Sequence, residues 1–234
     1  MGKRIHTPEW LDLGPAHYTE EEYNDCLKQL NRIGRFLGGD RATMRAFNTL
    51  PKPPTSILDV GCGGGQMAIR LAKRYPQAYV KGIDLSEPAI AFSKKTLKEQ
   101  NPQLQSIEFC VPPTAKLNEP PKSFDVVTTT LVCHHFSDDE IVDFMKRSII
   151  VAKEAVIIND LHRHSFATCS FSAIAPLCFP NRLILHDGPL SIKRAFKRDD
   201  WMEYLQAAGI PNRAWSLTWH WAFRWILILY PGKI

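Results

Sequence analysis

The chain has 234 residues, of which 44% are hydrophobic and 23% charged, and its net charge is +5. This length fits one α/β domain with a small addition and allows a sizeable core to be buried. The composition is that of an ordinary globular protein. The mild positive charge is too diffuse to predict a nucleic-acid-binding surface, and the basic cluster at 193–198 is expected to be a solvated face.

The six cysteines form no Cys-x-x-Cys pair. This usage favours reduced cysteines in a cytoplasmic protein over a disulfide framework or a zinc site. We expect neither a signal peptide nor a membrane-spanning segment, because no run approaches the roughly 20 apolar residues that a span needs. The apolar run 225–230 is expected to be a buried strand, with membrane-surface contact as the alternative.

The first 54 residues predict two helices. Apolar residues recur at helical spacing from Glu20 to Leu37, Thr19 is a plausible N-cap, and Gly38 with Gly39 ends the helix. A shorter helix is expected at 41–50, before the proline-rich segment 51–54. We therefore expect residues 1–54 to form a helical lid or arm over a ligand site. The alternative is a helix that merely packs on one face of the sheet.

After this arm, strand and helix signals alternate. Strands are expected at 56–60, 79–84, 106–111, 124–131 and 154–159, and helices at 66–74, 88–100 and 138–149, with Ser86 as an N-cap. Such alternation predicts a parallel sheet with helices on both faces. A domain at 55–234 would contain this sheet.

The alternation of strands and helices ends at 162–190, where three prolines predict an insertion of mixed helix and loop. Its apolar residues predict a cap over a substrate site, or a helix docked permanently on the sheet; they are Phe166, Phe171, Ile174, Leu177 and Phe179. A helix capped by Asp199 or Asp200 should follow, ending at Ala208. Two last strands, near 214–219 and 223–230, predict an antiparallel hairpin at the sheet edge.

A glycine loop follows the first predicted strand. Asp59 ends the strand, and Gly61, Gly63 and Gly65 occupy alternate positions before the next helix. Glycine there lets a ligand approach the backbone closely. Gln66 stands where a dinucleotide fingerprint needs its third glycine, and no P-loop lysine follows, so neither pyrophosphate nor triphosphate binding is predicted.

A second acid, Asp84, ends the second predicted strand. An acid about 20 residues after the glycines can accept both hydroxyls of a ribose. Asp59 would repel a pyrophosphate but suits a cation such as an α-ammonium group. The site therefore favours a nucleoside with an amino-acid end, and S-adenosylmethionine (SAM) has this chemistry.

Three motifs in this order carry a family resemblance. They are Asp-x-Gly-x-Gly-x-Gly at 59–65, Gly-Ile-Asp-Leu-Ser at 82–86, and Ser-Phe-Asp-Val-Val with Leu-Val-Cys-His-His-Phe at 123–127 and 131–136. Over roughly residues 55–160 the chain resembles class I SAM-dependent methyltransferases, and among them the ubiquinone and menaquinone methyltransferases and those acting on polyketides or phenols. The resemblance implies a Rossmann-like α/β fold with a mostly parallel seven-stranded sheet, helices on both faces and an antiparallel C-terminal hairpin.

The resemblance also implies the cofactor site. SAM, with S-adenosylhomocysteine as product, would be bound by Asp59, Gly61, Cys62, Gly63, Gly65, Asp84, Leu85, Thr130 and Leu131. Many relatives place an acid after the third strand to bind the adenine amino group. Here 111–115 holds no acid, and Thr114 or a backbone carbonyl is the expected substitute.

Histidines follow two strands on the expected ligand side. His134 and His135 come after the fourth strand, and His162 after the fifth. They are our candidates for a catalytic base, since a neutral histidine can assist a phenol to lose its proton. Their alternative is a packing or loop-capping role. As metal ligands they would need a carboxylate such as Asp160 or Asp187, and we expect no metal.

The predicted function is methyl transfer from SAM to a small acceptor, aromatic, phenolic or quinone-like, with oxygen slightly preferred over ring carbon. The alternatives are a non-catalytic SAM-binding or interaction protein and a methyltransferase for a macromolecule. We expect no nucleic-acid partner, because the tryptophans near the C-terminus are better explained by core or dimer contacts. A homodimer stays an open alternative.

Overall fold

The computed structural model describes residues 2–14 and 16–234 and contains one seven-stranded sheet. The strands are β1 (Ser56–Val60), β2 (Tyr79–Ile83), β3 (Ile107–Cys110), β4 (Phe124–Thr130), β5 (Ala152–Leu161), β6 (Trp215–His220) and β7 (Arg224–Leu229). Their order is β3-β2-β1-β4-β5-β7-β6. The first five pair in parallel, and β7 is antiparallel to both β5 and β6. The predicted fold is confirmed.

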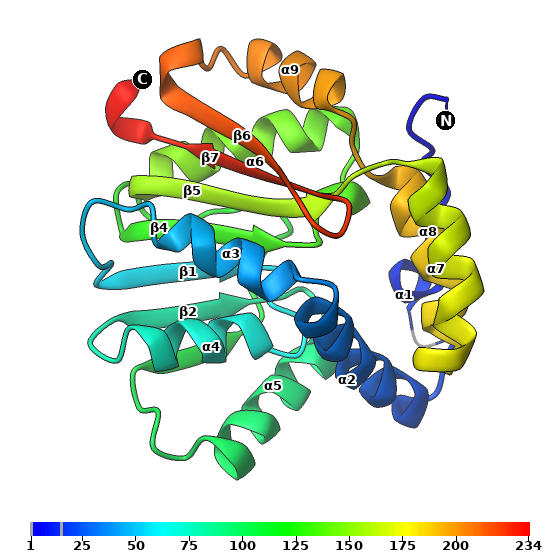
Figure 1. Cartoon of the computed structure of the whole chain (residues 1–234). Coiled ribbons are helices and arrows are strands. Elements are labelled where there is room, and N and C mark those ends of the chain that lie inside the picture. The colour runs from blue at the N-terminus through cyan, green and yellow to red at the C-terminus, as the bar shows by residue number, and fades with distance from the viewer. Residues whose placement is uncertain (1, 15) are drawn as a thin grey trace.

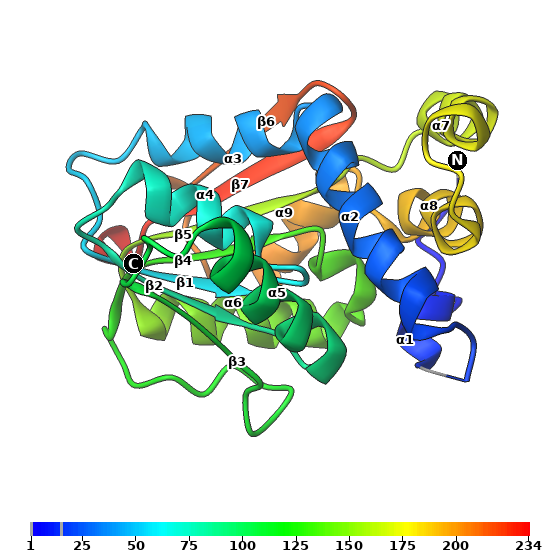
Figure 2. The ribbon, with the colours of Figure 1, turned by 90° about the horizontal axis from the view of Figure 1, so that it is seen from below.

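Helices cover both faces of this sheet (Figures 1 and 2). One face carries α3 (Gly39–Phe47), α4 (Gln66–Arg74) and α5 (Glu87–Gln100), and the other carries α6 (Asp138–Val151) and α9 (Arg198–Ala207). Successive side chains of a strand point to opposite faces. Accordingly Ile57 packs in the core beneath α3, α4 and α5, and Leu58 packs in the core beneath α6 and α9. Both side chains are fully buried. This double burial explains why the central strands are continuous apolar runs.

Local signals fix where most helices begin. Helix α2 (Glu20–Phe36) starts at Thr19, whose hydroxyl accepts the Glu22 N–H while the Glu22 carboxylate accepts the Thr19 N–H. This capping box satisfies amides that the helix itself leaves unpaired. Ser86 caps α5 as predicted, through a single hydrogen bond that its hydroxyl accepts from the Ala89 N–H.

The largest addition to the sheet lies at the carboxyl ends of the parallel strands. There α1 (Trp10–Leu13), α2, α7 (Ser165–Cys178) and α8 (Arg182–Arg194) gather beside the sheet (Figures 1 and 2). The segment predicted as mixed helix and loop therefore contains two long helices. Pro176 and Pro189 lie inside them, while the side chains of His164 and Asn181 cap their first turns.

One predicted cap was wrong. Neither Asp199 nor Asp200 is the N-cap of α9, because Lys197 holds that position. Asp200 instead reaches back from the third position of the helix and accepts the Lys197 N–H. None of the helices in the described ranges is both long and apolar enough to cross a membrane.

Candidate active site

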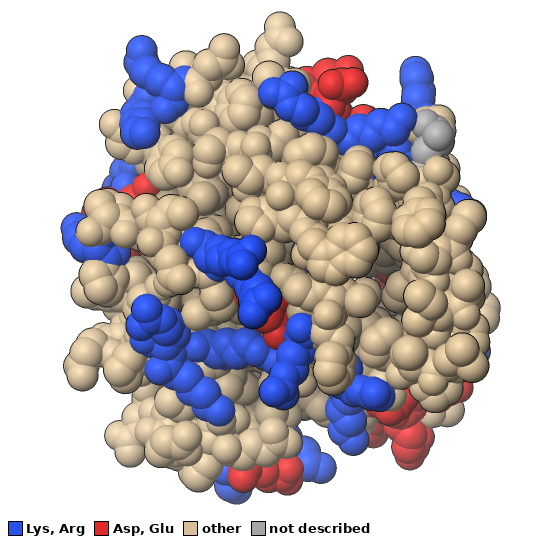
Figure 3. Space-filling model, viewed as in Figure 1, with Lys and Arg blue, Asp and Glu red and all other residues tan. Residues whose placement is uncertain are grey.

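A cavity of about 1210 Å³ opens at the carboxyl ends of β1, β2, β4 and β5. Single ligand pockets are commonly about 300–1,000 Å³, so this cavity has room for two molecules. One wall is built from the sheet loops, and the opposite walls come from α1, α2, α7 and α8. Over α7 the surface is nearly free of charge, whereas Lys and Arg gather over the middle of the same face (Figure 3).

The glycine loop forms the floor of the cavity near β1. Gly61 and Gly65 have positive φ angles of 68° and 75°. A Cβ added at Gly61 would lie 2.4 Å from Val132 Cγ2, and one at Gly65 would lie 2.6 Å from Phe109 Cζ. At Gly63 a Cβ would meet no atom within 4 Å. The first and third glycines are thus required by packing, and the second leaves its backbone open to the cavity.

Asp84 lies beside this loop, as predicted from its place after β2. Its Oδ2 accepts the Gly63 N–H at 2.8 Å, and its Oδ1 accepts the Ser86 N–H at 2.9 Å. Each oxygen keeps a second lone pair, and the side chain lines the cavity. Two fixed acceptors next to an open glycine fit the pair of hydroxyls on a ribose.

Asp59 also lines the cavity but is only 1% exposed. Burial, with a contribution from the nearby Asp84, raises the pKa of Asp59 to about 7, while a hydrogen bond to the Ala68 backbone opposes the rise. Its Oδ2 has no hydrogen-bond partner in the described part of the chain. This orphaned acceptor fits a cationic or hydrogen-bonding group of a ligand.

The remaining predicted cofactor residues surround these two acids. Cys62, Leu85, Thr130 and Leu131 all line the cavity. Leu85 is 58% exposed, which leaves an apolar face available to a ring. The Leu131 N–H is bonded to the Asn159 carbonyl at 2.9 Å, so the backbone after β4 is held at the sheet edge. All nine predicted residues except Gly65, which packs beneath the loop, line one cavity.

The loop after β3 has no acid at 111–115, as the sequence indicates. Residues 112–119 line the cavity, and the acid among them, Glu119, is paired with Lys81 at 2.7 Å. The Thr114 hydroxyl donates to the Lys116 carbonyl at 2.9 Å. Its oxygen still has lone pairs, so Thr114 and the neighbouring backbone are the polar groups placed to contact a base.

His134 is held inside the wall of the cavity. It is 3% exposed, and its Nδ1 lies 2.8 Å from Asp160 Oδ1. The Asp160 carboxylate is fully buried. Although burial opposes it, the charge and hydrogen bond of His134 hold the pKa of Asp160 below its usual range. An ionised Asp160 accepts from Nδ1, so the His134 ring is fixed with Nε2 toward the cavity.

His135 is the more accessible of the two rings. Its Nδ1 lies 2.7 Å from Asp12 Oδ1, and Arg194 binds Asp12 Oδ2 on the other side. Burial would raise the pKa of Asp12, but His135 and Arg194 together hold it well below its usual range. An ionised Asp12 accepts a hydrogen bond from Nδ1–H, and in the neutral ring this tautomer leaves the Nε2 lone pair of His135 available at the cavity.

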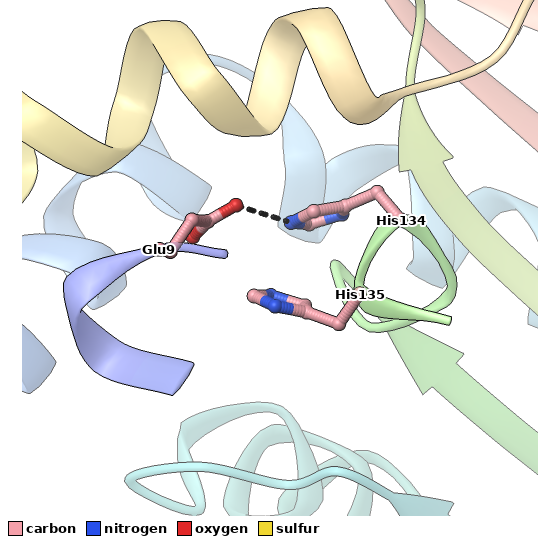
Figure 4. A group of neighbouring side chains, drawn as sticks. All are labelled: Glu9, His134 and His135. Carbon is pink, nitrogen blue, oxygen red and sulfur yellow. Dashed lines mark ion pairs between the residues drawn. The ribbon is translucent and has the colours of Figure 1, made fainter. Parts of the chain in front are cut away.

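Glu9 joins the two histidines from the N-terminal arm (Figure 4). Its Oε1 lies 3.8 Å from His134 Nε2 and 3.7 Å from Arg194 Nη1. Glu9 is 2% exposed. Burial raises its pKa to about 7, although His135, Ser191 and Arg194 lower it in part. One ligand atom from each of Glu9, His134 and His135 lies within 4.8 Å of the others, and the guanidinium of Arg194 already places a cation at this cluster.

His162 lines the cavity at a different point. Its Nδ1 accepts the Trp219 indole N–H at 3.1 Å. A neutral His162 therefore carries its proton on Nε2 and has no free lone pair. Burial and the nearby His164 lower its pKa. This geometry suits a hydrogen-bond donor better than a base.

Sequence reasoning missed three residues of this site: Glu9, Asp12 and Arg194. They come from the start of the chain around α1 and from the end of α8. The hydrogen bonds that join them to one another and to His135 link residues more than 50 positions apart in the sequence. The sequence offers no motif around Glu9 or Asp12. Arg194 belongs to the basic cluster 193–198, and the expectation of a solvated face is wrong there, because Arg194 is only 5% exposed.

A sheet of this order, with a glycine loop after β1 and an acid after β2, defines the class I methyltransferase fold. Residues 57–155 match the family model described as "Methyltransferase domain". This segment is therefore a methyltransferase domain, and the fold around it is that of the class I SAM-dependent methyltransferases.

Similarity to curated proteins is confined to part of the chain. A demethylmenaquinone methyltransferase of Thermus thermophilus is 31% identical over 112 residues, which cover 47% of this chain and 50% of that protein. A ubiquinone biosynthesis O-methyltransferase of Albidiferax ferrireducens is 39% identical over 89 residues, which cover 38% of this chain and 34% of that protein. The chain thus matches half or less of the length of these relatives.

Solved structures show the same fold along most of the chain. A SAM-dependent methyltransferase from Aquifex aeolicus has a TM-score of 0.64 at 17% identity and covers 88% of this chain and 97% of that one. The plantazolicin methyltransferase BpumL, crystallised with S-adenosylhomocysteine, has a TM-score of 0.67 at 18% identity. The match covers 94% of this chain and 91% of that one. These identities support the fold and leave the acceptor open.

Proposed function

We propose that this protein transfers a methyl group from SAM to a small, aromatic or phenolic acceptor, with a quinone-like acceptor as the closest variant. The observation that carries the proposal is Asp84, whose two oxygens are held by the Gly63 and Ser86 amides at the cavity floor. This geometry suits a ribose, and the orphaned Asp59 carboxylate suits the amino-acid end. SAM supplies, when bound, a methyl group activated by its positive sulfur.

We assign His135 as the base that removes the acceptor's proton. Asp12 orients its ring through Nδ1 and Arg194 fixes Asp12, so the Nε2 lone pair faces the acceptor space. A phenol has a pKa of about 10 and is largely protonated at neutral pH, so a positioned histidine would assist its attack. Asp160 holds His134 through Nδ1, and His162 carries its proton on Nε2, so we assign both of them positioning roles.

The N-terminal arm, residues 1–54, and helices α7 and α8 would act as the lid of this site. Their apolar side chains line the cavity opposite the glycine loop, among them Phe166, Phe171 and Ile174. Leu177 does not line it and is 86% exposed. An apolar cover favours an aromatic acceptor and excludes water, and positioning then supplies much of the rate. All six cysteines are free, in keeping with the proposed cytoplasmic location.

A methyl-donor assay against a panel of phenols, hydroxyquinones and polyketides tests this proposal. We expect SAM-dependent methylation of at least one phenolic hydroxyl, and mass spectrometry of the product separates O-methylation from ring C-methylation. In His135→Ala, kcat should fall by about 10²- to 10⁴-fold, whereas the exposed His17→Ala should behave as the wild type. Full activity of His135→Ala would remove the base assignment. Cofactor binding without turnover on any acceptor would favour the non-catalytic alternative.

A further inference from the structure

Arg224, the first residue of β7, is a buried cation that the proposed reaction does not use. It is 1% exposed and lines the cavity. Its Nε and Nη1 groups are buried and donate to no acceptor in the described part of the chain. Leaving a buried guanidinium without hydrogen bonds is costly, so these donors need an explanation.

The guanidinium lies against the start of helix α3. A Cβ added at Gly39 would be 2.9 Å from Arg224 Cζ and 3.0–3.1 Å from the two terminal nitrogens. Gly38 is the N-cap and offers no side chain to the first amides of α3. The positive end of the helix and the positive side chain therefore point to the same place.

Two carboxylates face this cation, and both already have partners. Asp40 is paired with Arg70 at 3.0 Å, and Asp160 holds the His134 ring and backbone. Both favour the charged form of Arg224 through space. Neither forms an ion pair with it among the described residues, where the ion pairs of these two acids go to Arg70 and His134. Arg224 thus keeps unpaired donors beside the start of α3.

We propose that Arg224 and the N-terminus of α3 form a carboxylate-binding subsite of the cavity. A planar guanidinium binds a carboxylate through parallel hydrogen bonds, and the free amides at a helix start add further donors. The carboxylate has two possible sources, the methionyl end of SAM or an acid group on the acceptor. The first source rests on the proposed function, and the second requires only the cavity.

Calorimetric titrations of wild-type protein, Arg224→Met and Gly39→Ala test the subsite with three ligands. S-adenosylhomocysteine carries the methionyl carboxylate, methylthioadenosine lacks the whole amino-acid end, and salicylate represents an acidic phenol. Met fills a similar volume without burying a charge, and replacing a buried charge by an apolar group is often tolerated. Arg41→Met, an exposed arginine in the same helix, is the control.

If the carboxylate belongs to the cofactor, Arg224→Met should weaken S-adenosylhomocysteine binding by about 10- to 100-fold and leave methylthioadenosine unchanged. If it belongs to the acceptor, the loss should appear with salicylate instead. Gly39→Ala should weaken the binding of the same ligand, because the added methyl group would press on the guanidinium. If Arg224→Met fails to fold, the Gly39→Ala variant still tests the subsite.

Wild-type affinity for every ligand in the folded variants would overturn the subsite. A wild-type protein that binds neither adenosyl compound would instead contradict the proposed function, and the salicylate titrations would still decide whether the subsite exists.

Discussion

At Glu9 the fold buries a carboxyl group next to two histidines and an arginine. Sequence alone could not reveal this environment, because a lone glutamate near the N-terminus would be expected to be exposed to solvent. Asp59 and Asp84 could be predicted, since each ends a strand and the strand ends of a parallel sheet converge. Glu9 and Asp12 depend instead on the path of the arm across the completed domain, which no local pattern encodes.

The buried Glu9 makes stability depend on pH. Its pKa in the folded protein is about 7, above the ordinary value of 4.5. The protonated form is therefore favoured in the folded state, and its stabilising effect is complete below pH 4.5 and lost as pH rises through 7. Relative to Glu9→Gln, the free energy of unfolding of the wild type should fall by on the order of 3 kcal/mol across this range.

Urea unfolding of wild type and Glu9→Gln between pH 4.5 and 8 measures this difference. Glu20→Gln, an exposed change in the first turn of α2, is the control and should leave the pH dependence of the wild type unaltered. If the difference in the free energy of unfolding between wild type and Glu9→Gln stays constant with pH, the burial of an ionisable Glu9 is contradicted.

Among the elements, those with local start signals were predicted well, and those held by distant contacts were not. Helices α2 and α5 begin at the predicted Thr19 and Ser86. Helix α1 has only four residues and was not predicted. Its first amides, on Trp10 and Leu11, donate to the carboxylate of Asp187 in α8 at 2.9 and 3.2 Å. Such a cap comes from 176 or more residues away, so the sequence near α1 contains no sign of it.

Removing this remote cap should release the arm. Asp187→Ala should lower the free energy of unfolding by about 0.5–2 kcal/mol, the usual effect of losing a helix cap. Amide hydrogen exchange at Trp10 and Leu11 should accelerate by more than exchange in the core of β4. Asp199→Ala, which changes an exposed acid of α9, should alter neither quantity. Unchanged protection of both amides in Asp187→Ala would show that α1 is held by other contacts.

In the whole molecule, the cavity joins two parts that differ in how readily sequence reveals them. The half built on β1, β2 and β4 follows from a glycine loop and two acids, and its residues could be named in advance. The other half combines α1 and α2 with α7 and α8, which meet only after the chain has folded. Their apolar walls would select the acceptor. This division explains why the cofactor is easier to predict than the substrate.

The most direct test of the account is calorimetric titration of the wild-type protein and of Asp84→Ala with S-adenosylhomocysteine. We predict one binding site in the wild type. Binding by Asp84→Ala should be about 1–3 kcal/mol weaker, because the ribose hydroxyls lose their charged acceptor. The exposed Asp139→Ala should bind as the wild type does. Absence of binding to the folded wild type would contradict the account, and equal affinity in Asp84→Ala would place the cofactor elsewhere.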